Sequence, residues 1–152
     1  MTSNEKKITI LVIDDDEFCR EMAQMILEEN FPYKILTAPS GMDGVDMLIK
    51  NTVHLILLDV AMPGWDGFKT LSVIRENVLL KKIPVIMLTA SADRDSIIKA
   101  SQYGVDDYIR KPFEPEDLVS RVSKAIWDHW QEESLDTLGA SIDDLLKDFG
   151  QD

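Results

Sequence analysis

The stretch that decides the fold is Val53–Gly67, Val-His-Leu-Ile-Leu-Leu-Asp-Val-Ala-Met-Pro-Gly-Trp-Asp-Gly. Val53–Leu58 is almost wholly apolar, rich in branched side chains and too short for most helices, so it predicts a strand buried on both faces. Asp59 ends this run, and Pro63 with two glycines forces the chain to turn. In a parallel sheet, ligands gather beyond the carboxyl ends of the strands. Asp59 is therefore a candidate cation ligand or nucleophile, with a role in capping the next turn as the plainer alternative.

Composition limits the classes of function. The 152 residues, 45% of them hydrophobic, suffice for one domain with a single core. A formal net charge of −12 disfavours direct binding to nucleic acid or to anionic membranes, which require basic patches. The single cysteine, Cys19, rules out an internal disulfide framework and suits a reducing compartment. The apolar run Ile8–Ile13 is too short for a signal peptide, and no segment approaches membrane-spanning length, so a cytoplasmic location is expected.

Strand-like and helix-like segments alternate along the chain. The predicted strands are Ile8–Ile13, Tyr33–Ala38, Val53–Leu58, Ile83–Leu88 and Val105–Arg110, the last being the least apolar and therefore expected at an edge. The predicted helices are Glu17–Asn30, Gly41–Lys50, Phe68–Glu76, Arg94–Tyr103 and one running from Glu114 or Pro115 to about Trp130. This alternation predicts an α/β fold, with a parallel sheet covered by helices on both faces.

Side-chain spacing and cap residues refine the helix predictions. Ser40 is a plausible N-cap and Gly104 a plausible C-cap. The apolar positions that fit the first helix are Phe18, Met22, Met25 and Ile26. In the second helix Val45, Leu48 and Ile49 are expected on the buried side, and in the third Leu71 and Ile74 are expected to face inward. His54, within a strand, and His129, near a helix end, are expected to be structural.

Polar groups stand at four predicted strand ends. They are Asp14 and Asp15, Asp59, Thr89 and Lys111. At one edge of a doubly wound sheet they can meet. Three carboxylates close together raise one another's pKa unless a cation neutralises them, and carboxylate and carbonyl oxygens are the ligands that Mg²⁺ prefers. With a lysine and a hydroxyl beside it, an aspartate is equipped to attack phosphorus and hold an acyl phosphate.

These motifs identify a family resemblance. The sequence resembles the receiver domain of two-component response regulators, the CheY-like domains, over roughly residues 7–127. The resemblance is carried by Ile-Leu-Val-Ile-Asp14-Asp15-Asp16, Leu-Ile-Leu-Leu-Asp59-Val-Ala-Met-Pro63-Gly-Trp-Asp-Gly67, Pro84-Val-Ile-Met-Leu-Thr89-Ala90 and Gly104-Val-Asp-Asp-Tyr108-Ile-Arg-Lys111-Pro112-Phe113. Each motif alone is weak, but their joint occurrence in order is specific. The resemblance implies a flavodoxin-like (βα)5 fold with strand order 2-1-3-4-5.

The resemblance also implies roles at the phosphorylation site. Asp59 is implied as the phosphoacceptor. Asp15 is implied to bind Mg²⁺ directly, Asp14 mostly through water, and Ala61 through its backbone carbonyl. Lys111 is implied to pair with the phosphoryl group, its position fixed by a peptide bond to Pro112 that is usually cis in this family.

Thr89 and Tyr108 are implied to form the switch pair. When Asp59 is phosphorylated by a sensor histidine kinase or a phosphotransfer protein, the surface of the fourth helix, fifth strand and fifth helix is expected to change and to control a partner or output domain. Ala61 and Ser91 lie at positions that, by the resemblance, are implied to tune dephosphorylation. Both side chains are small, so little shielding of the phosphate is expected. The chain is expected to be a signalling protein and not an enzyme in its own right.

Three alternatives stay open at this stage. Asp16 is expected to start the first helix, but a shift of one residue would make Asp15 and Asp16 the acidic pair. A haloacid-dehalogenase-like phosphatase would use Asp14 and Asp16, although Phe18 stands where that motif expects threonine. The third alternative is an interaction module with a vestigial site. A dinucleotide binder is disfavoured because no Gly-x-Gly-x-x-Gly follows the first strand.

The last residues differ from the rest. The sequence predicts a receiver domain over 1–127 and an acidic, partly helical extension over 128–152. Residues 127–152 contain eight acidic residues and one lysine, yet Leu135, Leu138, Ile142, Leu145 and Phe149 recur at spacings of three and four. Ser141 could cap a short helix after Gly139. The stripe predicts either a helix folded back on its own domain or a docking or dimer helix, which would permit a phosphorylation-dependent homodimer.

Overall fold

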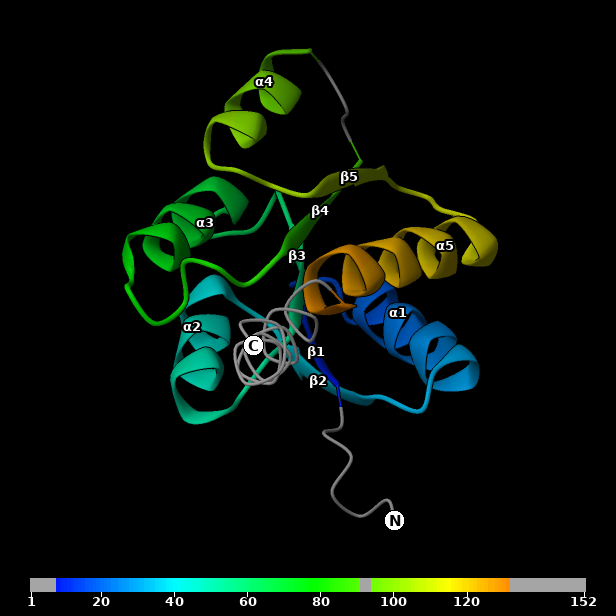
Figure 1. Cartoon of the computed structure of the whole chain (residues 1–152). Helices are drawn as coiled ribbons and strands as arrows, with labels where there is room; N and C mark the ends of the chain where they lie inside the picture. Colours follow the sequence, from blue (N-terminus) through cyan, green and yellow to red (C-terminus); the bar gives the residue numbers. More distant parts are fainter. Residues whose placement is uncertain (1–7, 91–93, 132–152) are drawn as a thin grey trace, which may run out of the picture.

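The computed structural model describes residues 8–90 and 94–131, and its elements alternate as predicted (Figure 1). The strands are β1 (Thr9–Ile13), β2 (Lys34–Ala38), β3 (Leu55–Asp59), β4 (Val85–Thr89) and β5 (Asp107–Arg110). The helices are α1 (Glu17–Asn30), α2 (Gly41–Lys50), α3 (Gly67–Glu76), α4 (Arg94–Gln102), α5 (Pro115–Ile126) and the π-helix η2 (Trp127–Gln131). The expected last helix is thus α-helical only to Ile126 and continues as a π-helix.

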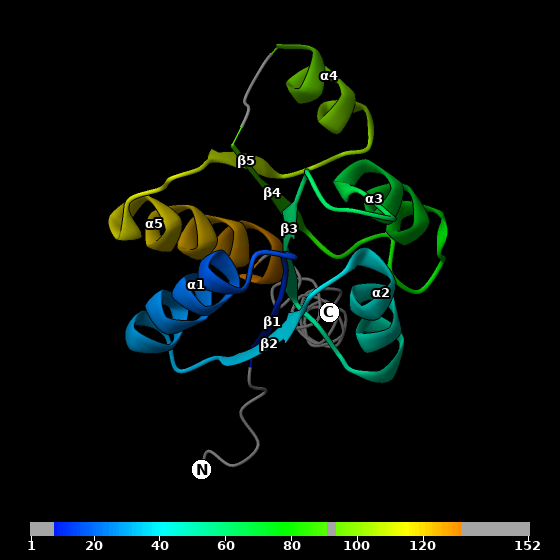
Figure 2. The same ribbon diagram turned by 180° about the vertical axis from the view of Figure 1, so that it is seen from behind.

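The strands form one parallel sheet in the order β2-β1-β3-β4-β5. This confirms the predicted flavodoxin-like fold and places β5 at an edge. Helices α1 and α5 cover one face of the sheet, and α2 and α3 cover the other (Figures 1 and 2). The three central strands are buried throughout, which explains why their sequences are continuously apolar and do not alternate.

The sheet separates two apolar clusters. Ile10, Leu55 and Ile86 belong to the cluster beneath α1 and α5, whereas Leu11, Ile56 and Met87 belong to the cluster beneath α2, α3 and α4. The side chains of consecutive strand residues therefore point to opposite faces of the sheet, as the pleat requires. Among the described residues, every helix is too short or too polar to span a lipid bilayer.

The predicted buried side of α2 is partly wrong, and in α1 the apolar positions are not all buried. In α1 the fully buried side is formed by Ala23, Ile26 and Leu27, while Phe18 and Met25 are 68% and 51% exposed. In α2, Leu48 is buried as predicted, but Ile49 is 67% exposed. Small side chains such as Ala23 contribute little to an apolar pattern although they let a helix approach the sheet closely, so the pattern of large apolar side chains does not by itself identify the buried face.

The predicted caps are confirmed. The Ser40 hydroxyl accepts a hydrogen bond from the Asp43 backbone N–H at 3.1 Å, and so begins α2. Gly104, which follows α4, has a φ of +74°, in the left-handed region that favours glycine. His54 is structural as expected, because its buried Nδ1 accepts the Thr9 N–H at 3.0 Å.

Candidate functional site

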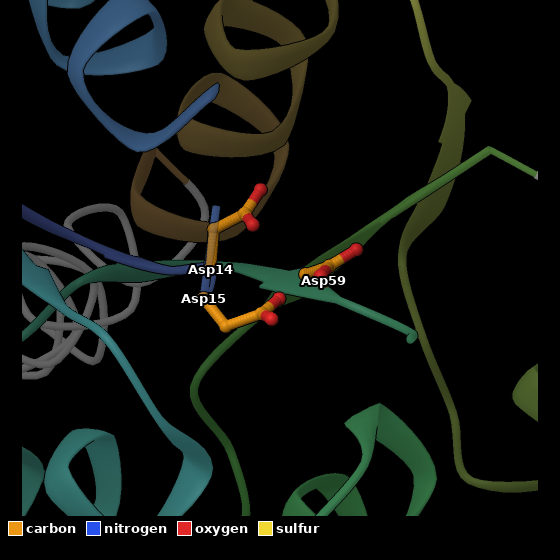
Figure 3. Close-up of side chains that lie close together, drawn as sticks. All are labelled: Asp14, Asp15 and Asp59. Atoms are coloured by element: carbon orange, nitrogen blue, oxygen red, sulfur yellow. The ribbon is translucent and has the colours of Figure 1, made fainter. Parts of the chain in front are cut away.

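Three carboxylates meet beyond the carboxyl ends of β1 and β3. Asp14 and Asp15 directly follow β1, and Asp59 is the last residue of β3 (Figure 3). One carboxylate oxygen from each of the three lies within 4.8 Å of the others. The β1–β3 register pairs Ile13 with Leu58, so the next residue along each segment, Asp14 and Asp59, lies beside the other. Asp14 and Asp59 are buried, whereas Asp15 is exposed.

Lys111 brings the positive charge from the end of β5. Its Nζ donates to Asp14 Oδ2 at 2.6 Å and to Asp59 Oδ1 at 3.2 Å. Its backbone N–H donates to the Thr89 carbonyl at 2.6 Å, which ties the residue to the end of β4, and the peptide bond from Lys111 to Pro112 is cis. The side chain is only 14% exposed, so both ion pairs are shielded from water.

The site carries an uncompensated negative charge. Burial, followed by the charge of Asp14, raises the pKa of Asp59 from 3.8 to about 7, despite the opposing effect of Lys111. Burial by itself would lower the pKa of Lys111, but its hydrogen bond to Asp14 and the two carboxylate charges outweigh this effect, and the pKa is raised. One ammonium therefore cannot satisfy three acids, and the site favours a further cation.

The donor set at this place fits Mg²⁺. Carboxylate oxygens from Asp14, Asp15 and Asp59 lie near a solvent-exposed loop that begins at Val60 and carries Ala61. Hard divalent cations take such oxygen ligands and keep several waters, which the exposed side of the site can supply.

Asp16 does not belong to this group. Its carboxylate accepts the backbone N–H groups of Phe18 at 2.9 Å and Cys19 at 3.3 Å, so it is the N-cap of α1. These hydrogen bonds keep the pKa of Asp16 below its usual value. Its own N–H donates to Asp14 Oδ1 at 2.9 Å. The structure therefore groups Asp14 and Asp15, and not Asp16, with Asp59.

Two supporting residues were missed by the sequence analysis. Gly67 begins α3, and a Cβ atom there would lie 2.5 Å from the Asp59 carbonyl oxygen and 2.7 Å from the Val60 Cα. Arg20 in α1 donates to the Asp14 carbonyl at 2.7 Å. The Asp-Gly pair at 66–67 could have signalled a close backbone approach, but no local pattern reveals the reach of Arg20 back to Asp14.

The predicted switch residues lie on neighbouring strands. Thr89 is buried and is the last residue of β4. The β3–β4 register pairs Asp59 with Leu88, the residue before Thr89, so Thr89 lies close to Asp59 along the edge of the sheet. Tyr108 lies on β5, where it pairs with Met87 of β4. Its partly buried ring packs against the apolar cluster beneath α2, α3 and α4. Ala61 is exposed, while Ser91 lies outside the described residues.

Comparison with known proteins identifies the family. The response regulator receiver domain model matches residues 10–123. The chain belongs to this family. It is 34% identical over 137 residues to the phosphate regulon transcriptional regulatory protein PhoB of Klebsiella pneumoniae, covering 88% of this chain and 59% of that protein. It is 35% identical over 113 residues to the transcriptional regulatory protein SrrA of Staphylococcus aureus, covering 74% and 45%.

The same relationship is visible in solved structures. A response regulator receiver domain protein from Methanospirillum hungatei superposes with a TM-score of 0.78 at 25% identity, covering 84% of this chain and 99% of that one. The chain spans only about half the length of the curated relatives named above. As a receiver domain it is a phosphorylation-dependent signalling switch, and the phosphatase alternative is not favoured.

Proposed function

We propose that Asp59 is the phosphoacceptor of this receiver domain. The observation that carries the proposal is the position of its buried carboxylate at the end of β3, 3.2 Å from the Lys111 ammonium and close to two further acids. An oxygen nucleophile needs neighbouring positive charge to approach an anionic phosphoryl group. Lys111 supplies one such charge here, and a bound divalent cation would supply the rest.

The phosphoryl donor is a phosphohistidine of a sensor histidine kinase or phosphotransfer protein. An Asp59 carboxylate oxygen attacks the phosphorus, the P–N bond breaks, and its electron pair returns to the imidazole, which takes a proton from solvent. Lys111 holds a phosphoryl oxygen by a charge-assisted hydrogen bond. Attack by water on the aspartyl phosphate later releases inorganic phosphate and restores the carboxylate. The domain therefore assists its own modification and reset, and we do not class it as a separate enzyme.

A Mg²⁺ ion at this site would be held by Asp15, Asp59 and the Ala61 backbone carbonyl, and by Asp14 chiefly through water. When bound, the ion neutralises the carboxylates and the transferring phosphoryl oxygens. Lys111 and the Asp16 N–H keep the Asp14 carboxylate oriented through hydrogen bonds of 2.6 and 2.9 Å.

Thr89 and Tyr108 transmit the change. The phosphoryl group accepts a hydrogen bond from the Thr89 hydroxyl, and Tyr108 turns inward, altering the surface formed by α4, β5 and α5. Moving this two-state element from 1:99 to 99:1 requires about 5.5 kcal/mol of preference for the active form. The small side chain of Ala61, with Ser91, leaves the phosphate open to water and so to a self-resetting signal.

We propose that residues 1–127 act as the receiver unit in the cytoplasm and that the altered surface controls a partner or an output domain. The acidic chain argues against direct nucleic-acid or membrane binding by this unit. A phosphorylation-dependent homodimer is one form of output that the same surface could support.

Phosphoramidate, a small donor with a P–N bond, tests the proposal. With Mg²⁺ present, intact-mass measurement should show one added phosphoryl group per chain, absent in Asp59→Asn and formed more slowly in Asp15→Asn. An exposed carboxylate variant, Asp46→Asn, is the matched control. No modification of the wild-type chain, or equal modification of Asp59→Asn, would contradict the proposal.

A panel of phosphomonoesters tests the rival chemistry with the same variants. Turnover that Asp14→Ala abolishes and Asp59→Ala preserves would assign the site to a phosphatase that uses the first strand. The proposed function predicts no turnover of these esters by any of the variants.

A further inference from the structure

A groove of about 370 Å³ lies at the end of the sheet opposite Asp59. Its walls come from the end of α2, the segments that precede β3 and β4, and η2. Leu48, Val53 and Ile83 contribute to its floor, and Ile49 and Leu79, which are 67% and 86% exposed, contribute to its edge. Large aliphatic side chains so exposed beside a groove are typical of an interaction surface.

The groove differs in charge from the rest of the molecule. The chain has 28 acidic residues, yet none of those in the described part of the chain lines the groove, whose charged lining residue is Lys82. In a protein with a net charge of −12, a wall without acidic residues repels an acidic partner less than an acid-lined surface would.

The described chain ends at the groove wall. His129 and Trp130 of η2 line the groove, and η2 is anchored there because the Trp130 indole N–H donates to the His54 carbonyl at 2.7 Å. Leu135 follows Gln131 by four positions, so it lies within about 14 Å of the end of η2 whatever its conformation. The segment that follows is therefore held at high effective concentration beside the groove.

The composition of that segment matches the groove. Residues 132–152 contain seven acids and one lysine, and their apolar stripe of Leu135, Leu138, Ile142, Leu145 and Phe149 has helical spacing. We propose that the segment from Leu135 to Phe149 docks into this groove within the same chain, its apolar stripe covering Ile49 and Leu79. A mostly acidic helix with one apolar face is the occupant that both the lining and the charge favour.

This contact would leave the phosphorylation site free. The groove lies at the amino ends of β3 and β4, whereas Asp59 and Thr89 stand at their carboxyl ends. In the groove, the segment would cover the end of the domain at the amino ends of β3 and β4, and would not obstruct Lys111 or the surface of α4, β5 and α5. The inference does not rest on the identity of the phosphoacceptor.

Hydrogen exchange of the full chain tests the proposal. Backbone amides between Ile142 and Phe149 should exchange about tenfold or more slowly than in an unstructured peptide of the same sequence. Leu79→Glu should abolish most of this protection, because it introduces a carboxylate into the contact. Since Leu79 is 86% exposed, the variant should fold normally. Met25→Glu, which changes an exposed apolar residue of α1, should leave the protection unchanged.

Each other outcome overturns the proposal. Unprotected amides would show that the groove does not hold this segment, and protection insensitive to Leu79→Glu would place the segment elsewhere. Protection that rises with protein concentration, together with a dimer in sedimentation, would assign the groove to the segment of a second copy. Leu145→Glu supplies the reciprocal arm and should speed exchange at the amides of residues 79–83.

Discussion

Burial and neighbouring charge act strongly on the carboxylate of Asp59. Its pKa is about 3.8 in an unfolded chain and about 7 in the folded one, chiefly because it is buried and secondly because Asp14 is nearby. Between these pH values the folded state binds more protons than the unfolded state. Its contribution to the free energy of unfolding is therefore fully present below pH 4 and is lost as pH rises towards 7.

Asp59→Asn should remove this pH dependence. In the absence of divalent cations, the variant should match the wild-type free energy of unfolding near pH 4 and exceed it by about 4 kcal/mol at pH 8, because each pKa unit corresponds to about 1.4 kcal/mol. Chemical denaturation across this range measures the difference. Asp46→Asn, which changes an exposed carboxylate, should give no such trend, and a pH-independent gain in Asp59→Asn would contradict the assigned shift.

Lys111 should be coupled energetically to both acids. Lys111→Met leaves Asp14 and Asp59 without their shared ammonium, so the free energy of unfolding at pH 8 should fall by about 3 kcal/mol. In an Asp59→Asn background the loss should be smaller, because one of the two buried charges is gone. A double-mutant cycle measures this coupling, and strict additivity would mean that the 3.2 Å contact carries no energy.

At the level of elements, α3 packs closely against the end of β3 because its first residue is Gly67. The Gly67 N–H donates to the Val60 carbonyl at 2.7 Å, and there is no space for a Cβ atom on Gly67 beside the Asp59 backbone. Gly67→Ala should lower the free energy of unfolding by about 2 kcal/mol and slow phosphorylation, because the backbone of Asp59 must shift.

Gly64→Ala is the matched control for this prediction. Gly64 has a φ of +74°, but a Cβ atom added there would meet no atom of the described residues within 4 Å. Alanine at this position should therefore cost about 1 kcal/mol and leave phosphorylation nearly unchanged. Equal effects of the two variants on phosphorylation would show that the close approach at Gly67 does not position Asp59.

Arg75, at the carboxyl end of α3, joins this helix to the segment before β4 and to the turn after α4. Its guanidinium donates to the carbonyls of Tyr103 at 2.8 Å, Ile83 at 2.9 Å and Gly104 at 3.0 Å. Arg75→Lys should lower the free energy of unfolding by about 2 kcal/mol and speed hydrogen exchange in the turn between α4 and β5, because an ammonium cannot serve this fan of acceptors. Unchanged exchange in that turn would contradict the bridging role.

The order of elements could be predicted because each strand is a short apolar run and each helix starts or stops at a recognisable residue. Ser40, Asp16 and Gly104 act through local hydrogen bonds or dihedral angles, which sequence encodes directly. The buried side of α2 was predicted less well, since Ile49 was expected there but is exposed, and in α1 the apolar Phe18 is exposed too. Their exposure depends on which strands each helix crosses, and that is a property of the assembled sheet.

On the scale of the whole molecule, the strand order gathers the site from residues as distant as Asp14 and Lys111. The sequence predicted that these side chains would meet because parallel strands share one carboxyl edge. It could not predict that Lys111 would lie closer to Asp14 than to Asp59, at 2.6 and 3.2 Å, or that Arg20 and Gly67 would support the site. Those contacts depend on packing between elements distant in the sequence.

The central claim is that Asp14, Asp15, Asp59, Thr89 and Lys111 form one site for Mg²⁺ and a phosphoryl group. The most direct measurement is an NMR titration of the full chain with beryllofluoride, a phosphoryl mimic, with and without Mg²⁺. We predict saturable amide shifts at Asp59, Thr89 and Lys111 that require both additions, extend to Tyr108 and α4, and vanish in Asp59→Asn. Shifts that occur without Mg²⁺, survive in Asp59→Asn or never appear would contradict the account.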